Sequence, residues 1–254
     1  MRRTLVACLI LLLATPLAAQ NHEAWPERAF VTLNVPVQPL DNDFSESVSF
    51  ADTLRTTENV TFGARYESAR GALFDVGTGI RLTKTFGVGV TASWFERSRS
   101  GSFELLVPNP IVANRPLDLA GSVGGLKRSE LGIHIQGLYA FGLGPRTRLM
   151  VSGGPTVFAI RQDLVRSIEF DKLPGFTGLT FHDALVAEVA ETTIGFNAGG
   201  DLTWRLASRL GIGAIVRYTR GTATFDPGAE SGVSRAIEVR AGGLHVGGGI
   251  RLLF

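Results

Sequence analysis

The four histidines and the acidic residues near them are the side chains best suited to move a proton at neutral pH. His134 lies four residues after Glu130, and His182 is followed directly by Asp183 in the stretch FHDAL. Nucleophilic catalysis needs a histidine beside an activated serine or a carboxylate. No activated-serine motif accompanies His134, and an exposed polar pair such as His182 and Asp183 is ordinary in a loop. We therefore expect a protein that is not an enzyme.

Metal and thiol chemistry have equally little support in the residue spacing. No two histidine or acidic side chains fall at a ligand spacing on one face of an element. The single cysteine, Cys8, lies in an N-terminal apolar segment that we expect to be removed. We therefore predict no bound metal, no cofactor and no disulfide in the mature chain.

Many of the remaining charged residues stand singly among glycines, opposite apolar residues. In ALFDVGTGIRL (72–82), Asp75 and Arg81 share one side of the segment with Gly77 and Gly79, whereas Phe74 and its apolar partners take the other. A charge that is buried alone is costly, so charges on one inner face are expected to pair with one another. The chemistry of this chain therefore depends on the elements that carry these faces.

Period-two alternation identifies those elements as β-strands. In TIGFNAGGDLTWRL (193–206), the even positions are apolar and the odd positions are small, polar or charged. The same division recurs over several other segments: 72–82, 86–94, 131–141, 210–218 and 244–254. A strand with one apolar and one polar face lies between two different environments.

The N-terminus has the features of a secretory signal. Two arginines precede the apolar run Leu5–Ala14, and the small residues Ala18 and Ala19 follow it. We expect cleavage after Ala19 or Gln20, so that 1–20 is a signal peptide and 21–254 is one mature domain. Beyond that segment, no apolar run approaches the roughly 18–20 residues that a transmembrane helix requires.

Two architectures fit repeated alternating strands, a soluble sandwich and a transmembrane barrel. The polar faces carry many glycines and single charges, and aromatic residues gather near the strand ends, as in the girdles of a membrane barrel. The expected connections also alternate in length. Those at TKT, LGPRT and LASR are short, and those at about 98–127, 164–190 and 226–234 are long. Short turns at one end and long loops at the other favour the barrel.

The last strand carries a pattern with a known resemblance. Val246, Ile250, Leu252 and the terminal Phe254 lie at every second position of LHVGGGIRLLF. This resembles the C-terminal signature of bacterial outer-membrane proteins, and the whole mature chain is most similar to the small OmpA-like and OmpW-like β-barrel-domain proteins. The resemblance implies location in the outer membrane of a Gram-negative bacterium and recognition of the last strand by the barrel-assembly machinery.

The number of strands follows from a parity argument. From residue 72 onward the pattern predicts seven strands, and a barrel with both ends in the periplasm needs an even total. Segments 29–37, 45–54 and 59–67 each alternate and supply three more. We therefore predict an all-β, transmembrane, antiparallel up-and-down barrel of ten strands. The alternative is eight, with two of the early segments outside the wall.

The alternation also predicts which side chains line the lumen. In a narrow barrel these side chains fill most of the interior, so they form either a paired plug or a thin charged pore. The residues expected to face inward are Arg65, Asp75, Arg81, Glu130, His134, Asn197, Asp201, Arg205, Arg217, His245 and Arg251.

The expected function is therefore that of an integral outer-membrane barrel with a structural or narrow-pore role. The alternatives are an adhesin or receptor that acts through its long loops and, with less support, an outer-membrane enzyme acting on lipid A or peptides. Expected partners are outer-membrane lipid and lipopolysaccharide, with an external partner of the loops left unidentified. The net charge of +2 and the dispersed Lys and Arg give no support to nucleic-acid binding.

Overall fold

The computed structural model describes residues 25–39, 44–51, 59–66, 71–109, 111–112, 115–225 and 237–254, most of them in β-strands. The predicted signal 1–20, with Cys8, lies outside these ranges. Among the described residues, no helix is long and apolar enough to cross a membrane. The elements in chain order are β1 (Ala29–Gln38), β2 (Phe44–Ala51), β3 (Asn59–Tyr66), β4 (Gly71–Ala72), β5 (Phe74–Arg81), β6 (Phe86–Val107), β7 (Leu117–Gly142), β8 (Thr147–Lys172), the 3-10 turn η1 (Pro174–Phe176), β9 (Leu179–Arg205), β10 (Leu210–Phe225) and β11 (Ile237–Leu253).

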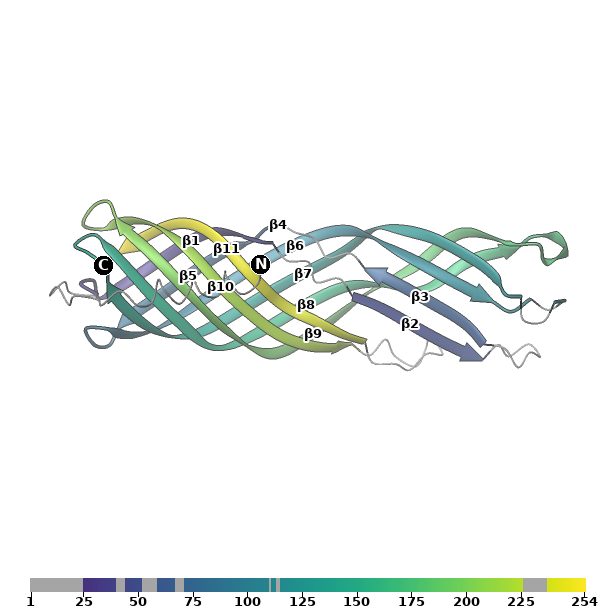
Figure 1. Ribbon diagram of the computed structural model, residues 1–254, viewed down its shortest axis with the longest axis horizontal. Helices are drawn as coiled ribbons and strands as arrows, with labels where there is room; N and C mark the ends of the chain where they lie inside the picture. Colours follow the sequence, from purple (N-terminus) through teal and green to yellow (C-terminus); the bar gives the residue numbers. More distant parts are fainter. Residues whose placement is uncertain are drawn as a thin grey trace, which may run out of the picture.

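Eight strands close into a ring in which all neighbours are antiparallel (Figure 1). The order around the ring is β1, β5, β6, β7, β8, β9, β10 and β11, which pairs again with β1. At this seam Leu33 lies opposite Ile250, and Phe30 lies opposite Leu253. The predicted all-β, up-and-down antiparallel barrel is therefore confirmed, and its last strand is the one that closes it.

The predicted number of ten strands is wrong, and the alternative of eight is what the ring contains. Two of the early alternating segments form the hairpin β2–β3, which pairs with the far end of β6, where Thr61 lies opposite Leu106. They cannot enter the wall because β1 pairs directly with β5, with Leu33 opposite Val76. Parity is preserved because the two segments leave the wall together.

Two glycines of β11 pack directly against the backbone of β1 at the seam. A Cβ atom built on Gly249 would lie 1.9 Å from the carbonyl oxygen of Leu33, and one on Gly247 would lie 2.3 Å from the Cα of Pro36. Side-chain carbons do not approach other atoms to such distances, so these two positions require glycine. The glycine-rich inner face of the last strand therefore allows the barrel to close.

Strands β6 to β9 are far longer than a membrane requires. They contain 22, 26, 26 and 27 residues, whereas a transmembrane strand needs about 9–11. Figure 1 shows them continuing to the end of the molecule opposite the C-terminus. The long loops predicted over 98–127 and 164–190 are thus wrong, because most of these residues extend the strands. The third, 226–234, lies outside the described residues.

The outer surface of the ring is an apolar belt. Ile194 is 75% exposed, Trp204 55% and Val88 39%, and all three point away from the lumen. Aromatic pairs border the belt, with Phe74 stacked on Trp94 towards the long-strand end and Tyr139 against Phe141 near the short turns. Exposed apolar side chains in a continuous band of this kind are what contact with lipid requires.

The interior changes character along the long axis. Near the short turns, Trp25, Phe30 and Leu253 belong to a buried apolar cluster. The middle of the ring is polar, as described below. Beyond it, apolar clusters fill the interior again, first around Phe158 and Phe225 and then among the extended strands. We call the part of β6 to β9 beyond the ring, together with β2 and β3, the extension.

Candidate functional site

The middle of the lumen contains two ion pairs contributed by four different strands. Arg217 of β10 is bonded to Asp75 of β5, and both side chains are almost completely buried. Arg251 of β11 donates from Nη2 to Asp201 Oδ2 of β9 over 2.5 Å. The first pair crosses the lumen and the second joins the two strands that flank β10, because each partner occupies an inward position of its strand.

Asn34 of β1 connects the two pairs. Its Nδ2 donates to Asp75 Oδ1 over 2.8 Å, and its Oδ1 accepts from Arg251 Nη1 over 2.6 Å. Asn34 is 3% exposed. The amide therefore places a neutral dipole between an anion and a cation, with its oxygen toward the cation and its nitrogen toward the anion. The result is one connected network rather than two separate pairs.

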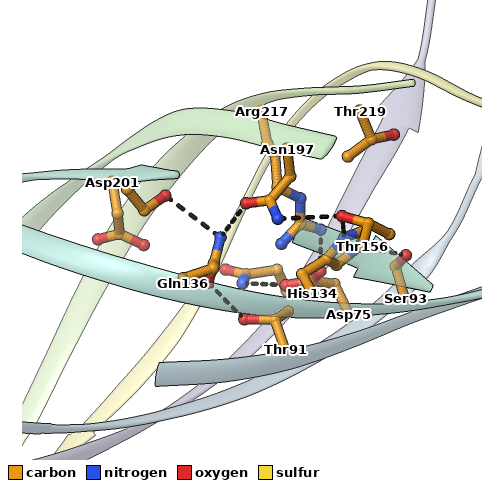
Figure 2. A network of polar contacts seen from close by, with 12 residues as sticks. Asp75, Thr91, Ser93, His134, Gln136, Thr156, Asn197, Asp201, Arg217 and Thr219 are labelled. Atoms are coloured by element: carbon orange, nitrogen blue, oxygen red, sulfur yellow. Dashed lines mark hydrogen bonds and ion pairs between the residues drawn. The ribbon is translucent and has the colours of Figure 1, made fainter. Parts of the chain in front are cut away.

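A layer of neutral side chains continues this network (Figure 2). Gln136 donates to Asn197 Oδ1 over 2.9 Å and accepts from Thr91 at 3.1 Å. Asn197 in turn donates to Thr156 Oγ1 over 3.0 Å. Thr156 and Ser93 lie on the two ring nitrogens of His134, each at 2.9 Å. Strands β6, β7, β8 and β9 are thereby tied together across the lumen.

The long-strand end of this polar region is closed by Glu130. Its Oε1 accepts the backbone N–H of Gly242 over 2.8 Å, and its Oε2 lies 3.3 Å from Arg128 Nη2. The same guanidinium donates to the carbonyl of Arg240 over 2.8 Å. Glu130 and Arg128 therefore connect β7 to β11 across the barrel.

The opposite end is filled by the segment that leads into β1. Trp25 is fully buried, and its carbonyl accepts from Arg81. Glu27 is bonded to Arg148 and accepts from Arg205 Nη2 over 3.0 Å. The guanidinium of Arg148 also lies 5.6 Å from the Trp25 ring, within cation–π range. This lead-in closes the mouth of the barrel on the side of the short turns.

The predicted lumen residues occupy three kinds of position. Arg81, Asp201 and Arg205 are partly exposed on the inward side, near the short turns. Arg65 lies on β3, outside the ring, and its side chain is exposed; its assignment to the lumen is wrong because Ala64 takes the inward position on that strand. The remaining seven are buried, namely Asp75, Glu130, His134, Asn197, Arg217, His245 and Arg251.

Two histidines behave differently from one another. The ring nitrogens of His134 bond Ser93 and Thr156 rather than Glu130, which lies four residues away on the same strand. His245 is equally buried, and neither of its ring nitrogens has a hydrogen-bond partner among the described residues. The Ser93–His134 contact resembles the serine–histidine part of a catalytic triad, but a threonine rather than a carboxylate orients the imidazole.

Sequence reasoning missed several residues of the network. Trp25 and Glu27 precede the first predicted strand, 29–37, and only the fold shows that this segment enters the barrel. Arg148, Gln136 and Thr156 occupy inward positions of strands that were identified correctly. The alternation pattern could have found Gln136, which lies in phase with His134 on β7, whereas no residue of β8 was predicted to face the lumen.

The space left in the lumen is small. A cavity of about 40 Å³ lies among Asp75, Gln136, Asp201 and Arg217, bordered by Phe30 and Arg148. A polar cavity of this size holds a few water molecules. Among the described residues, no group of three histidine, cysteine or acidic side chains is arranged to hold a metal ion.

The alternate apolar residues near the end of the last strand form a row on the outer surface. Val246, Ile250, Leu252 and Phe254 all point to the outer surface, and Phe254 is 61% exposed. The backbone N–H of Phe254 donates to the carbonyl of Ala29 over 2.9 Å, so this residue is held at the seam.

Comparisons with known proteins concern the fold. No protein-family model and no curated protein matches the chain. The outer membrane protein OprG from Pseudomonas aeruginosa, a solved structure, is 12% identical, with a TM-score of 0.52 over 92% of this chain and 97% of OprG. Neisserial surface protein A is 14% identical, with a TM-score of 0.45 over 90% of this chain and 100% of that one. With its closed ring, its apolar belt and its likeness to OprG, the chain has the fold of the small bacterial outer-membrane β-barrel proteins.

Proposed function

We propose that this protein is a closed, structural outer-membrane barrel rather than a conducting pore. The observation that carries the proposal is the two ion pairs inside the lumen, Arg217 with Asp75 and Arg251 with Asp201. A pore selective for ions needs a continuous water path lined by charges that remain free to attract the ion. Here the charges neutralise one another, and the space among them is about 40 Å³.

Single-channel recording in planar bilayers tests this function. The purified wild-type barrel should give no steady conductance at moderate voltage. The double variant Asp75→Ser with Arg217→Ser removes the central pair together with its bulk, and it should conduct if it folds. Folding is checked by the electrophoretic shift on heating. Steady conductance of the wild type would overturn the proposal in favour of the narrow pore.

A second candidate, partner binding at the cell surface, is favoured by the apolar residues near the tip of the extension. Leu185 is 60% exposed and Ile111 66% exposed, and both lie beyond the ring. Apolar side chains held on a rigid sheet are suited to contact another macromolecule. The test is retention of cells that express the wild type or Leu185→Ser on coated surfaces. Equal retention at matched surface expression would argue against this role.

A further inference from the structure

The short-turn end of the barrel is strongly basic. Seven cationic side chains lie in the lead-in 25–28 and the turns 81–86, 142–148 and 205–210, against one side-chain carboxylate, Glu27. The carboxyl group of Phe254 also lies there, where its oxygen accepts the backbone N–H groups of Arg28 and Ala29. The cationic residues are Arg28, Arg81, Lys84, Arg146, Arg148, Arg205 and Arg209.

A recess of about 430 Å³ opens at this end between the lead-in and the turn that joins β9 to β10. Arg205, Ser208 and Arg209 line one part of it together with Glu27, which is paired with Arg205, and Pro26, Leu253 and Phe254 line another. It therefore combines two guanidinium groups and a hydroxyl with an apolar wall. Arginine forks of this kind match the oxygens of a phosphate group.

The two arginines have donors to spare. Glu27 is shared between Arg148 and Arg205, so one carboxylate faces two guanidinium groups. Among the described residues, the Nε of Arg205 is buried without a hydrogen-bond partner, and Arg209 has an exposed side chain with no ion pair. A bound anion would offset the excess of the three guanidinium groups of Arg148, Arg205 and Arg209 over the carboxylates of Glu27 and Phe254.

The turn that presents these residues is fixed by its backbone. The N–H groups of Leu206 and Ala207 donate to the carbonyl of Leu210 over 2.9 and 3.0 Å. The N–H of Leu253 donates to the carbonyl of Arg209 over 2.9 Å, which ties the turn to the last strand. The recess is therefore formed before any ligand arrives, and this lowers the cost of binding.

The recess also lies at the edge of the apolar belt. Trp204 and Leu206 precede the turn and are more than half exposed on the outer surface, as is Phe254 beside the recess. This is the level at which aromatic residues meet the headgroups of a bilayer. We propose that the recess binds the phosphate group of an anionic phospholipid from the leaflet on the short-turn side, through Arg205, Ser208 and Arg209.

Native mass spectrometry of the delipidated full-length mature barrel tests this inference. Phosphatidylglycerol added to this barrel should bind. Phosphatidylcholine, whose headgroup carries a compensating cation, should bind more weakly. Arg209→Gln and Ser208→Ala should each reduce phosphatidylglycerol binding, the former roughly tenfold. Lys84→Gln is the matched control, because it removes one positive charge from another short turn that does not line the recess.

Three results would overturn the proposal. Equal loss of lipid in Lys84→Gln and Arg209→Gln would indicate a general charge effect without a site. Unchanged binding of phosphatidylglycerol in Arg209→Gln would show that the lipid does not bind in the recess. Displacement of the lipid by inorganic phosphate at equal concentration would show a site for the free anion rather than for a lipid headgroup.

Discussion

At the scale of single residues, the barrel depends on pairing charges that could not be buried alone. Arg217 and Arg251 are almost completely inaccessible to solvent, and each loses its hydration on folding. The partner carboxylates and Asn34 compensate for this loss through short, charge-assisted hydrogen bonds. A buried pair of this kind adds little net stability, but removal of one partner is costly because the other charge remains.

Asp75→Ala should therefore destabilise the barrel by about 3–5 kcal/mol, since it leaves Arg217 unpaired in the lumen. The matched control is Asp171→Ala, which removes a carboxylate whose contact with His182 is exposed to solvent and should cost less than about 1 kcal/mol. Urea unfolding in lipid vesicles, followed by tryptophan fluorescence, measures both. Similar midpoints for the two variants would contradict the role of the pair.

A substitution at Phe254 distinguishes the stability of the barrel from its assembly in the membrane. We expect Phe254→Asp to refold in detergent nearly as well as the wild type, because a charge near the interface costs only about 0–1 kcal/mol. Recognition of the last strand by the assembly machinery should be sensitive to the same change, so the yield in the membrane should fall strongly. Equal membrane yields at matched expression would leave Phe254 as an interfacial anchor only.

The alternation in the sequence predicted on which side of a strand a side chain lies, but it did not predict which residues that side chain contacts. Asp75, His134 and Asn197 were placed inward by the phase of their strands, and all three are buried. His134 and Glu130 share a face and do not meet, because residues four apart on a strand are separated by more than about 10 Å along it. Partners come from the register between strands, which brings Ser93 and Thr156 to His134 and which no single strand encodes.

At the scale of elements, the molecule consists of strands that serve two environments. In the ring, inward positions are polar and outward ones are apolar. In the extension the order reverses, so that Phe103 and Leu105 of β6 are buried while Ser102 and Glu104 are exposed. One strand thus changes the polarity of its inner face along its length, as it passes from lipid to water.

Irregular pairing in the extended strands explains why the sequence pattern predicts loops there. The pairing register shifts between Arg99 and Gly101 of β6, where the extra residue lies on β7, and again between Val165 and Ser167 of β8. A bulge adds one residue to one strand and breaks the period of two. A reading that requires strict alternation therefore ends the strand at the bulge, although pairing continues beyond it.

Phe103→Ala tests whether the extension has a core of its own. Phe103 is 4% exposed, and its ring lies 5.1 Å from that of Phe181. Its truncation should cost about 3–5 kcal/mol locally. Hydrogen exchange should accelerate in the far parts of β6 to β9 and stay unchanged in the ring. Ser102→Ala, at the exposed neighbouring position, is the control, and loss of protection throughout the ring would show a single cooperative unit instead.

At the scale of the whole molecule, the sequence predicted the class of fold but not the number of strands in the barrel wall. Segments 45–54 and 59–67 alternate just as wall strands do, and the described part of each forms a strand. What differs is the partner: β3 pairs with β6 beyond the ring, and β1 has already paired with β5. Hydropathy alone gives the same pattern for a strand in the wall and a strand in the extension, so parity could not decide between eight and ten.

The same division into ring and extension predicts where the membrane ends. Val88 and Ser102 are both exposed outward positions of β6, but Val88 lies in the apolar belt and Ser102 lies in the extension. Spin labels at Val88 and Ile194 should relax faster with oxygen, which concentrates in lipid. Labels at Ser102 and Asp118 should respond more strongly to a water-soluble nickel chelate. If the label at Ser102 preferred oxygen, the membrane would have to cover the extension, and lipid would then face the carboxylates at Glu104 and Asp118, at a free-energy cost that the apolar belt avoids.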